Sequence, residues 1–172
     1  MEHYSDLIRD IPDFPEPGVV FKDITPILAD PGIFSRLVDE MAEPFRDQGV
    51  TQVAGIEARG FTLAAPIALT LGAGFIPIRK PGKLPYETAA EEYTLEYGSD
   101  RLEVHVDAAD SGDRVLLVDD VIATGGTATA ALKLIESLGA EVAGFSVFIE
   151  LAFLNGKVGL PDIPYHALLV YD

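Results

Sequence analysis

The chain alternates between short apolar runs and longer stretches in which apolar residues recur at helical spacing. The apolar runs predict strands, over residues 52–56, 75–78, 115–118, 142–149 and 167–170. The helical spacing predicts helices, over residues 31–45, 61–71 and 127–138. Because strands and helices alternate from residue 50 to 150, we expect βαβ units around a mainly parallel sheet.

Other parts of the chain carry weaker patterns. Residues 7–10 are expected to end a short helix, and the proline-rich residues that follow, up to Pro26, are expected to be irregular. Residues 79–98 are polar and lack a clear period, and a loop of this length is usually a functional lid or disordered. Residues 93–97, however, alternate in a way that fits a β-ribbon equally well, and residues 102–106 predict a further strand.

The most informative motif is VLLVDDVIATGGT at residues 115–127. A buried strand is expected to end at Asp119 and Asp120, and Gly125 and Gly126 then open a helix. Converging backbone N–H groups and the helix dipole favour a phosphate at that point. Two adjacent carboxylates suit the hydroxyl groups of a ribose, with or without Mg²⁺. The alternative is an ordinary strand, loop and helix N-cap.

Two better-known phosphate motifs are absent from this sequence. A Walker loop requires a lysine directly after its second glycine, and no lysine follows Gly126. A dinucleotide-binding fingerprint requires GxGxxG between a strand and a helix, and none occurs there. The motif therefore predicts a ribose-phosphate site of a different kind.

Basic residues gather near two other predicted strand ends. The turn at residues 57–60 repeats the order of strand, charged turn and helix start, and Arg59 can offer bidentate donors to an anion. Arg79, Lys80 and Lys83 lie within five residues of each other in a chain whose net charge is −16. Such a basic cluster in an acidic chain indicates an anionic partner, although ordinary exposed turns remain the alternative.

Composition narrows the possible classes of function. A length of 172 residues suits a single domain, residues 1–172, with a substantial core. The chain has no cysteine and only three histidines, which excludes disulfides and argues against structural zinc. The net charge of −16 opposes binding to nucleic acid or to an anionic membrane. The acidic surface can serve either to keep the protein soluble or to adapt it to a salty cytoplasm. Neither a signal peptide nor a membrane span is evident, so we expect a cytoplasmic protein.

Five motifs follow one another along the chain: PGVVFKDITPIL, EARGF, IRKPGKLP, YTLEYG and VDDVIATGGT. In their order and approximate spacing the chain resembles the adenine phosphoribosyltransferase branch of the type I phosphoribosyltransferase family. The resemblance implies a single-domain α/β fold with a mainly parallel, twisted sheet flanked by helices. It also implies a base-binding N-terminal strap at residues 1–30 and a flexible catalytic lid loop at residues 79–98.

The same resemblance implies transfer of the phosphoribosyl group of phosphoribosyl diphosphate (PRPP) to adenine, giving AMP and diphosphate in purine salvage. Mg²⁺ would be bound mainly through PRPP with no direct protein ligand, and the protein would be a homodimer. Glu96 would be the general acid or base, with Arg59 and Lys83 as further catalytic residues. Adenine would be bound by Val20, Phe21, Lys22 and Val121. PRPP would be bound by Glu57, Ala58, Arg79, Lys80, Asp119, Asp120, Ala123, Thr124, Gly125, Gly126 and Thr127.

Some positions depart from the family pattern. Lys22 stands where arginine is usual, and because lysine supplies only a point charge, a bidentate contact is not expected there. Glu57-Ala58 stands where aspartate-serine is common. A transferase for another purine would share the ribose-phosphate site and is one rival interpretation. A regulator that binds PRPP and nucleic acid is the other, and it would need a basic face that the net charge of −16 opposes.

Overall fold

The computed structural model of the chain describes residues 3–95 and 98–172. Glu96, the expected acid or base, therefore lies outside the described residues. By its internal contacts the chain divides into two compact units, Met1–Asp39 and Glu40–Asp172. The expected N-terminal strap falls within the first unit, and the predicted parallel sheet falls within the second.

The first unit is more regular than the sequence pattern suggested. A short helix α1 (Tyr4–Leu7) ends at the first of the residues 7–10, where a helix end was expected. The strands β1 (Arg9–Pro12) and β2 (Val20–Asp23) pair as an antiparallel hairpin. The prediction that this proline-rich part of the chain is irregular is therefore wrong for β1 and β2. Proline is tolerated at a strand end, and Pro12 occupies that position opposite Val20.

Two helices complete this part of the chain, α2 (Thr25–Ala29) and α3 (Pro31–Ala42). The carboxylate Oδ1 of Asp30 accepts hydrogen bonds from the backbone N–H groups of Gly32 and Ile33, both at 2.9 Å. These bonds satisfy N–H groups that the first helical turn leaves unpaired. Asp30 is therefore the N-terminal cap of α3, and the predicted start of this helix at residue 31 is confirmed.

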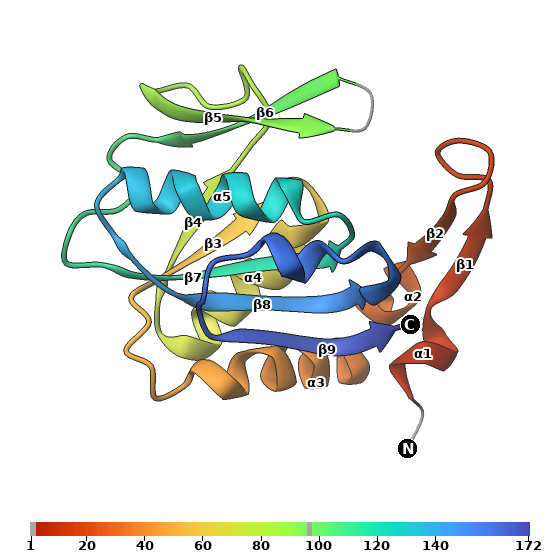
Figure 1. Ribbon diagram of the computed structural model, residues 1–172. Coiled ribbons are helices and arrows are strands. Elements are labelled where there is room, and N and C mark those ends of the chain that lie inside the picture. Colours follow the sequence, from red (N-terminus) through yellow and green to blue (C-terminus); the bar gives the residue numbers. More distant parts are fainter. Residues whose placement is uncertain (1–2, 96–97) are drawn as a thin grey trace. The chain divides into compact units, whose positions relative to one another are not determined.

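The second unit contains a parallel sheet with the strand order β4-β3-β7-β8-β9 (Figure 1). The predicted parallel arrangement is confirmed, since each neighbouring pair runs in the same direction. The bounds are β3 (Gln52–Ile56), β4 (Gly74–Ile78), β7 (Arg114–Ile122), β8 (Glu141–Leu151) and β9 (Tyr165–Tyr171). Strand β3 matches its predicted range. Strand β7 continues to Ile122, so Asp119 and Asp120 lie within its last residues and not beyond its end.

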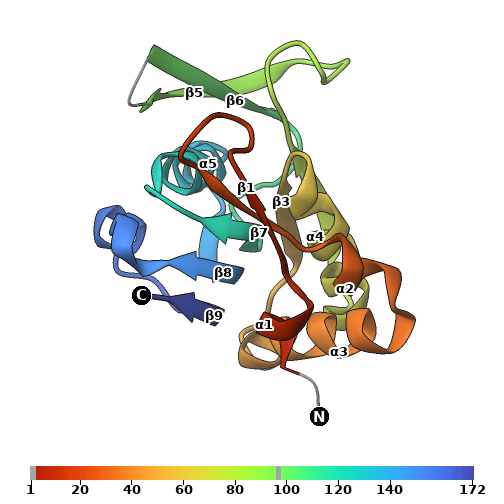
Figure 2. The same cartoon turned by 90° about the vertical axis from the view of Figure 1, so that its right-hand side faces the viewer.

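Helices α4 (Arg59–Leu71) and α5 (Gly126–Ser137) cover opposite faces of this sheet (Figure 2). Pro66 lies inside α4 and does not end the helix. Short 3₁₀ turns are η1 (Glu43–Phe45), η2 (Ala152–Leu154) and η3 (Gly156–Gly159). Among the described residues, none of the helices combines the length and the apolar character that crossing a membrane requires.

The segment expected to be a lid loop is largely a β-ribbon. Strands β5 (Thr88–Leu95) and β6 (Gly98–His105) pair in antiparallel register, with Thr88 opposite His105. The ribbon lies alongside α5 (Figure 1), so α5 is packed between the ribbon and the sheet. This position explains why α5 buries Ala130 and Leu134 in addition to Ala128, Ala131, Leu132 and Ile135.

Candidate functional site

A cavity of about 470 Å³ opens in the second unit where β3 and β7 end. Adjacent parallel strands end at the same edge of a sheet, so the loops that follow them converge. The structure thereby brings together the turn after β3 and the motif at residues 115–127, as the sequence predicted. The cavity is lined by Ile56, Glu57, Ala58, Arg59, Lys80, Asp119, Asp120, Val121, Ile122, Ala123, Thr124, Gly125, Thr127 and Ala128.

The start of α5 forms one wall of the cavity. Gly125 is the N-cap residue, and its φ of 84° lies in the left-handed region that favours glycine. Its carbonyl oxygen accepts the helical hydrogen bond from the N–H of Thr129 at 2.9 Å. The N–H groups of the first helical turn have no intrahelical acceptor, and the helix dipole places partial positive charge there. This end of α5 is consequently suited to an anion.

Two carboxylates lie on the adjacent wall. Oδ1 of Asp119 accepts a hydrogen bond from the backbone N–H of Asp120 at 2.9 Å. Burial, together with the neighbouring charge of Asp120, raises the pKa of Asp119 well above its ordinary range. Asp120 is itself only 6% exposed, and its Oδ2 accepts no hydrogen bond within the described part of the chain. These oxygens can accept hydrogen bonds from ligand hydroxyl groups.

Arg59 connects the two strand ends. It begins α4, and its Nε lies 2.8 Å from Oδ2 of Asp120 as an ion pair. The next residue, Gly60, approaches β7 closely: a Cβ at this position would lie 2.8 Å from Oδ1 of Asp119 and 3.2 Å from the carbonyl oxygen of Val118. The peptide bond between Glu57 and Ala58 is cis. Only glycine fits at position 60 without moving the carboxylate of Asp119.

Glu57 holds the basic segment that follows β4. Its Oε2 accepts a hydrogen bond from Nε of Arg79 at 2.9 Å and another from the backbone N–H of Lys80 at 3.0 Å. Arg79 also donates from Nη1 to the carbonyl oxygen of Lys83 at 3.3 Å. Of the three predicted cations in this segment, Lys80 lines the cavity, whereas Arg79 and Lys83 are not part of its lining.

The side chain of Lys80 is engaged by the ribbon. Its Nζ donates hydrogen bonds to Oδ2 of Asp100 and, at 2.9 Å, to the hydroxyl oxygen of Tyr93. The Tyr93 hydroxyl in turn donates to Oδ2 of Asp100 at 3.0 Å. Burial lowers the pKa of Lys80, but the hydrogen bonds to Asp100 and Tyr93 outweigh it and leave that pKa raised.

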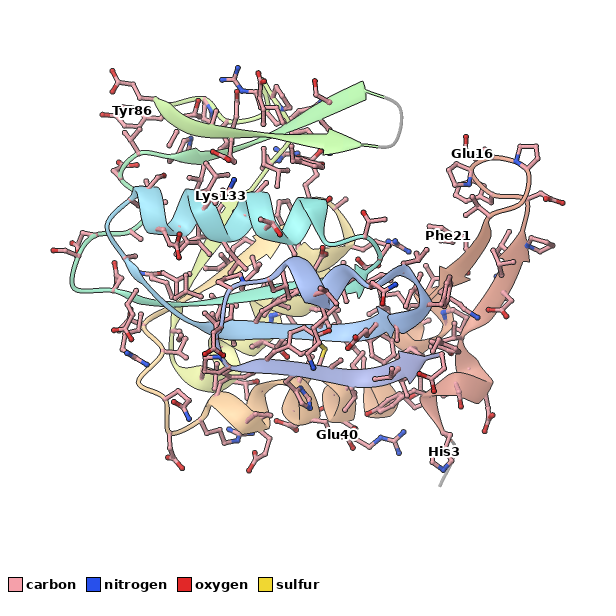
Figure 3. The ribbon with its side chains drawn as sticks, in the orientation of Figure 1. His3, Glu16, Phe21, Glu40, Tyr86 and Lys133 are labelled. Atoms are coloured by element: carbon pink, nitrogen blue, oxygen red, sulfur yellow. The ribbon has the colours of Figure 1, made fainter. Side chains whose placement is uncertain are left out.

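Sequence reasoning missed Asp100 and assigned no role to the Tyr93 hydroxyl. The two residues face each other in the register of β5 and β6, which the sequence alone could not establish. A second ion pair joins the ribbon to α5, because Nζ of Lys133, which is labelled in Figure 3, lies 3.1 Å from Oε1 of Glu91. The ribbon is thus attached both to the cavity wall and to the helix.

The predicted adenine-binding residues are distributed over both units. Val20, Phe21 and Lys22 lie on β2 in the first unit, and Val121 lines the cavity in the second. The Phe21 ring (Figure 3) packs edge-on against Phe14 with 5.1 Å between centroids. Nζ of Lys22 lies 2.7 Å from Oδ1 of Asp10, so its charge is already paired.

No group of three or more histidine, aspartate and glutamate side chains among the described residues is arranged to hold a metal ion. The cavity does contain oxygen donors, Asp119 and Asp120, of the kind that a hard cation such as Mg²⁺ prefers. With only adjacent carboxylates available, a bound cation would need most of its ligands from a substrate or from water.

Comparison with known proteins gives concordant matches over most of the chain. The family model of the phosphoribosyl transferase domain matches residues 26–159. The adenine phosphoribosyltransferase of Myxococcus xanthus is 61% identical over 149 residues, which cover 87% of this chain and 81% of that protein.

Solved structures agree in fold. The crystal structure of adenine phosphoribosyltransferase from Rhodothermus marinus superposes with a TM-score of 0.94 at 52% identity, covering 98% of this chain and 96% of that one. The Saccharomyces cerevisiae enzyme, crystallised with adenine and an imino-altritol bisphosphate, gives a TM-score of 0.91 at 40% identity, covering 96% of each chain. The single-domain α/β fold inferred from the motifs is therefore confirmed by structures that match nearly the whole chain.

Proposed function

The chain belongs to the adenine phosphoribosyltransferases of the phosphoribosyl transferase family, and we propose that the cavity where β3 and β7 end is its PRPP site. The protein transfers the phosphoribosyl group of PRPP to adenine and gives AMP and diphosphate. The proposed location of the site rests on one observation: the start of α5 and the carboxylates of Asp119 and Asp120 line the same cavity. An anion-binding helix end beside hydroxyl acceptors suits a ribose phosphate.

In this proposal the 5-phosphate is bound by the loop at residues 123–127. The backbone N–H groups of Gly125, Gly126 and Thr127 would donate to the phosphate oxygens, with hydroxyl donors from Thr124 and Thr127. Asp119 and Asp120 would accept hydrogen bonds from the ribose hydroxyls. Oδ2 of Asp120 is buried and ion-paired with Arg59, but it accepts no hydrogen bond from the described residues, which supports this role.

The cations around the cavity would bind the diphosphate. Loss of diphosphate leaves positive charge at ribose C1, so the site must stabilise the departing negative charge. Arg59 and Lys80 line the cavity and would face the diphosphate, and Glu57, Ala58, Arg79 and Lys83 would complete this part of the site. Bound mainly through the oxygens of PRPP, Mg²⁺ would neutralise part of the charge on the leaving group.

The adenine half of the site is proposed on the resemblance, with local support from the first unit. Val20, Phe21 and Lys22 would frame the base, with Val121 packing against it. Val20 is 51% exposed and Phe21 presents an aromatic ring on the same strand, which suits contact with a planar base. Glu96 would exchange a proton with the purine ring as general acid or base.

Closure of residues 79–98 would complete the site. It would exclude water that could otherwise hydrolyse PRPP, and would position the purine nitrogen against C1. We also propose, from the family resemblance, a homodimer that works in the cytoplasm. Light scattering on the purified protein measures the mass directly, and a monomeric mass at working concentrations would contradict the dimer.

The decisive experiment is to measure AMP formation from adenine and PRPP, with and without Mg²⁺. We expect turnover with adenine to exceed turnover with hypoxanthine, guanine or xanthine, and EDTA to abolish it. Preference for another purine would contradict the assigned base, and full turnover in EDTA would contradict the proposed use of Mg²⁺.

Glu96 is tested separately with Glu96→Gln. Glu92→Gln serves as a matched control because it removes one carboxylate from β5, four residues earlier in the chain. We expect kcat to fall by roughly 10²–10⁴-fold in the first variant only, with little change in PRPP affinity. Near-normal turnover of Glu96→Gln would remove this residue from the chemistry.

A further inference from the structure

Gly156 lies against the loop that we assign to the 5-phosphate, although α5, β8 and η2 separate the two segments along the chain. A Cβ on Gly156 would lie 2.8 Å from the backbone nitrogen of Gly125 and would also overlap the carbonyl oxygen of Ala123. Conversely, a Cβ on Gly125 would overlap the carbonyl oxygen of Gly156. The two glycines therefore allow two backbone segments to approach more closely than side chains permit.

The conformation of Gly156 does not by itself require glycine. Gly156 is not among the glycines with positive φ, whereas Gly125 has a φ of 84°. Asn155, the residue before Gly156, adopts the left-handed conformation in this turn, with a φ of 56°. Since an L-residue could adopt the backbone angles of Gly156, the contact with the phosphate loop is what excludes a side chain there.

The contact falls on the atoms that matter for binding an anion. Gly125 is the N-cap residue of α5, and the carbonyl of Ala123 belongs to the peptide that precedes Thr124. Any shift of these peptides would change the direction of the N–H groups at the start of α5. Gly156 itself is buried and does not line the cavity, so it can act on a ligand only through the loop.

We propose that Gly156 is a positioning residue for the 5-phosphate of PRPP. Its backbone packs against residues 123–125 without lining the cavity, and this contact sets the direction of the phosphate-binding N–H groups. This inference rests on the proposed function, specifically on the assignment of residues 123–127 to the 5-phosphate. It adds the turn between η2 and η3 to the site, although this turn contributes no side chain to the cavity lining.

The test compares Gly156→Ala with Gly159→Ala, using ribose 5-phosphate as the probe. Gly159 is a matched control because it lies in the same 3₁₀ turn and a Cβ there would have no atom within 4 Å. In Gly156→Ala we expect the Kd for ribose 5-phosphate and the KM for PRPP to rise by roughly 10–100-fold. The KM for adenine at saturating PRPP should stay within about threefold, whereas a distortion that spreads through the whole site would raise both KM values. Gly159→Ala should match the unaltered protein.

A third variant, Thr127→Val, separates this inference from the proposed function. Weaker ribose 5-phosphate binding in Thr127→Val but not in Gly156→Ala would overturn the role of Gly156 and leave the site assignment standing. Unchanged binding in both variants would overturn both. A rise in the adenine KM equal to the rise in the PRPP KM would also overturn the specific role of Gly156.

Hydrogen exchange on the unaltered protein keeps the inference testable if Gly156→Ala does not fold. Ribose 5-phosphate should slow amide exchange in peptides that cover residues 123–127 and also in peptides that cover residues 154–158. Protection confined to residues 123–127 would show that the turn at Gly156 is not coupled to the phosphate loop.

Discussion

Nε of Arg59 lies 2.8 Å from Oδ2 of Asp120, and this ion pair joins the loop after β3 to the end of β7. The side chain of Asp120 is 8% exposed, whereas that of Arg59 is 36% exposed. The carboxylate is therefore the buried partner, and the guanidinium reaches it from the edge of the cavity. The pair holds a cation at the cavity wall before any substrate arrives.

This asymmetry predicts that Arg59→Ala destabilises the protein more than Arg59→Ala combined with Asp120→Asn. The single variant leaves a buried carboxylate without its ion partner, whereas the double variant also removes the charge. We expect a coupling free energy of about 1–3 kcal/mol in urea unfolding. Strictly additive effects would show that the pair contributes nothing to the free energy of unfolding.

The raised pKa of Asp119 predicts a stability that falls as the pH rises. The protonated carboxyl favours the folded state below the ordinary pKa of aspartate, and this contribution is lost as the pH rises through the raised pKa of the folded state. Asp119→Asn cannot ionise, so its free energy of unfolding should exceed that of the unaltered protein by a margin that grows over this pH range. Its PRPP affinity should be lower, because asparagine is a weaker acceptor for ribose hydroxyls.

Thermal melts of the two proteins from acid to neutral pH measure this margin. Asp107→Asn, at an exposed position, is the control and should leave the pH profile unchanged. A constant difference between Asp119→Asn and the unaltered protein at every pH would contradict the burial of an ionising group at this site.

Under the proposed assignment of Lys80 to PRPP, Asp100 would compete with the substrate for this cation. PRPP would then have to share or replace the hydrogen bonds that Nζ of Lys80 donates to Asp100 and Tyr93. Asp100→Asn keeps an acceptor of similar size but removes the charge, so we expect the KM for PRPP to fall by about two- to fivefold. Glu91→Gln changes the net charge equally and removes the ribbon's pair with Lys133, and it should have no such effect. An increased KM in Asp100→Asn would mean that Asp100 assists binding.

Gly60→Ala should destabilise the protein although alanine favours helices. The added Cβ would lie 2.8 Å from Oδ1 of Asp119, and that carboxylate is held by the N–H of Asp120 and cannot simply rotate away. We expect a loss of about 1–2 kcal/mol in the free energy of unfolding after the gain in helix propensity is included. Denaturant titration measures this free energy of unfolding. A Gly60→Ala variant more stable than the unaltered protein would show that β7 can move away from the added Cβ at little energetic cost.

Local patterns were sufficient to predict most of the second unit. Strand β3, the parallel sheet and the start of α5 follow from apolar runs, glycine positions and the alternation of element types. The two loops that the resemblance assigned to PRPP do meet, because parallel strands end at one edge of the sheet. The ion pair between Arg59 and Asp120 was not predicted. In these cases the relevant signal lies within about fifteen consecutive residues, or follows from a general property of parallel sheets.

Features that depend on pairing between distant segments were not predicted. The extension of β7 to Ile122 depends on its partner β8, and the ribbon depends on the register that sets Tyr93 opposite Asp100. Gly156 carries no local signal at all, since its need for glycine arises from the backbone of Gly125. The hairpin of β1 and β2 was missed because proline content was given more weight than pairing.

The carboxylates around the cavity have a consequence for how the protein responds to salt. Arg59, Arg79 and Lys80 each already have an internal counter-ion, in Asp120, Glu57 and Asp100 respectively. Binding of a polyanion is then an exchange of one set of negative partners for another, and not the neutralisation of bare cations. Dissolved ions screen the outgoing and the incoming partners alike. The affinity for PRPP should therefore vary less with ionic strength than the number of cations at the site would suggest.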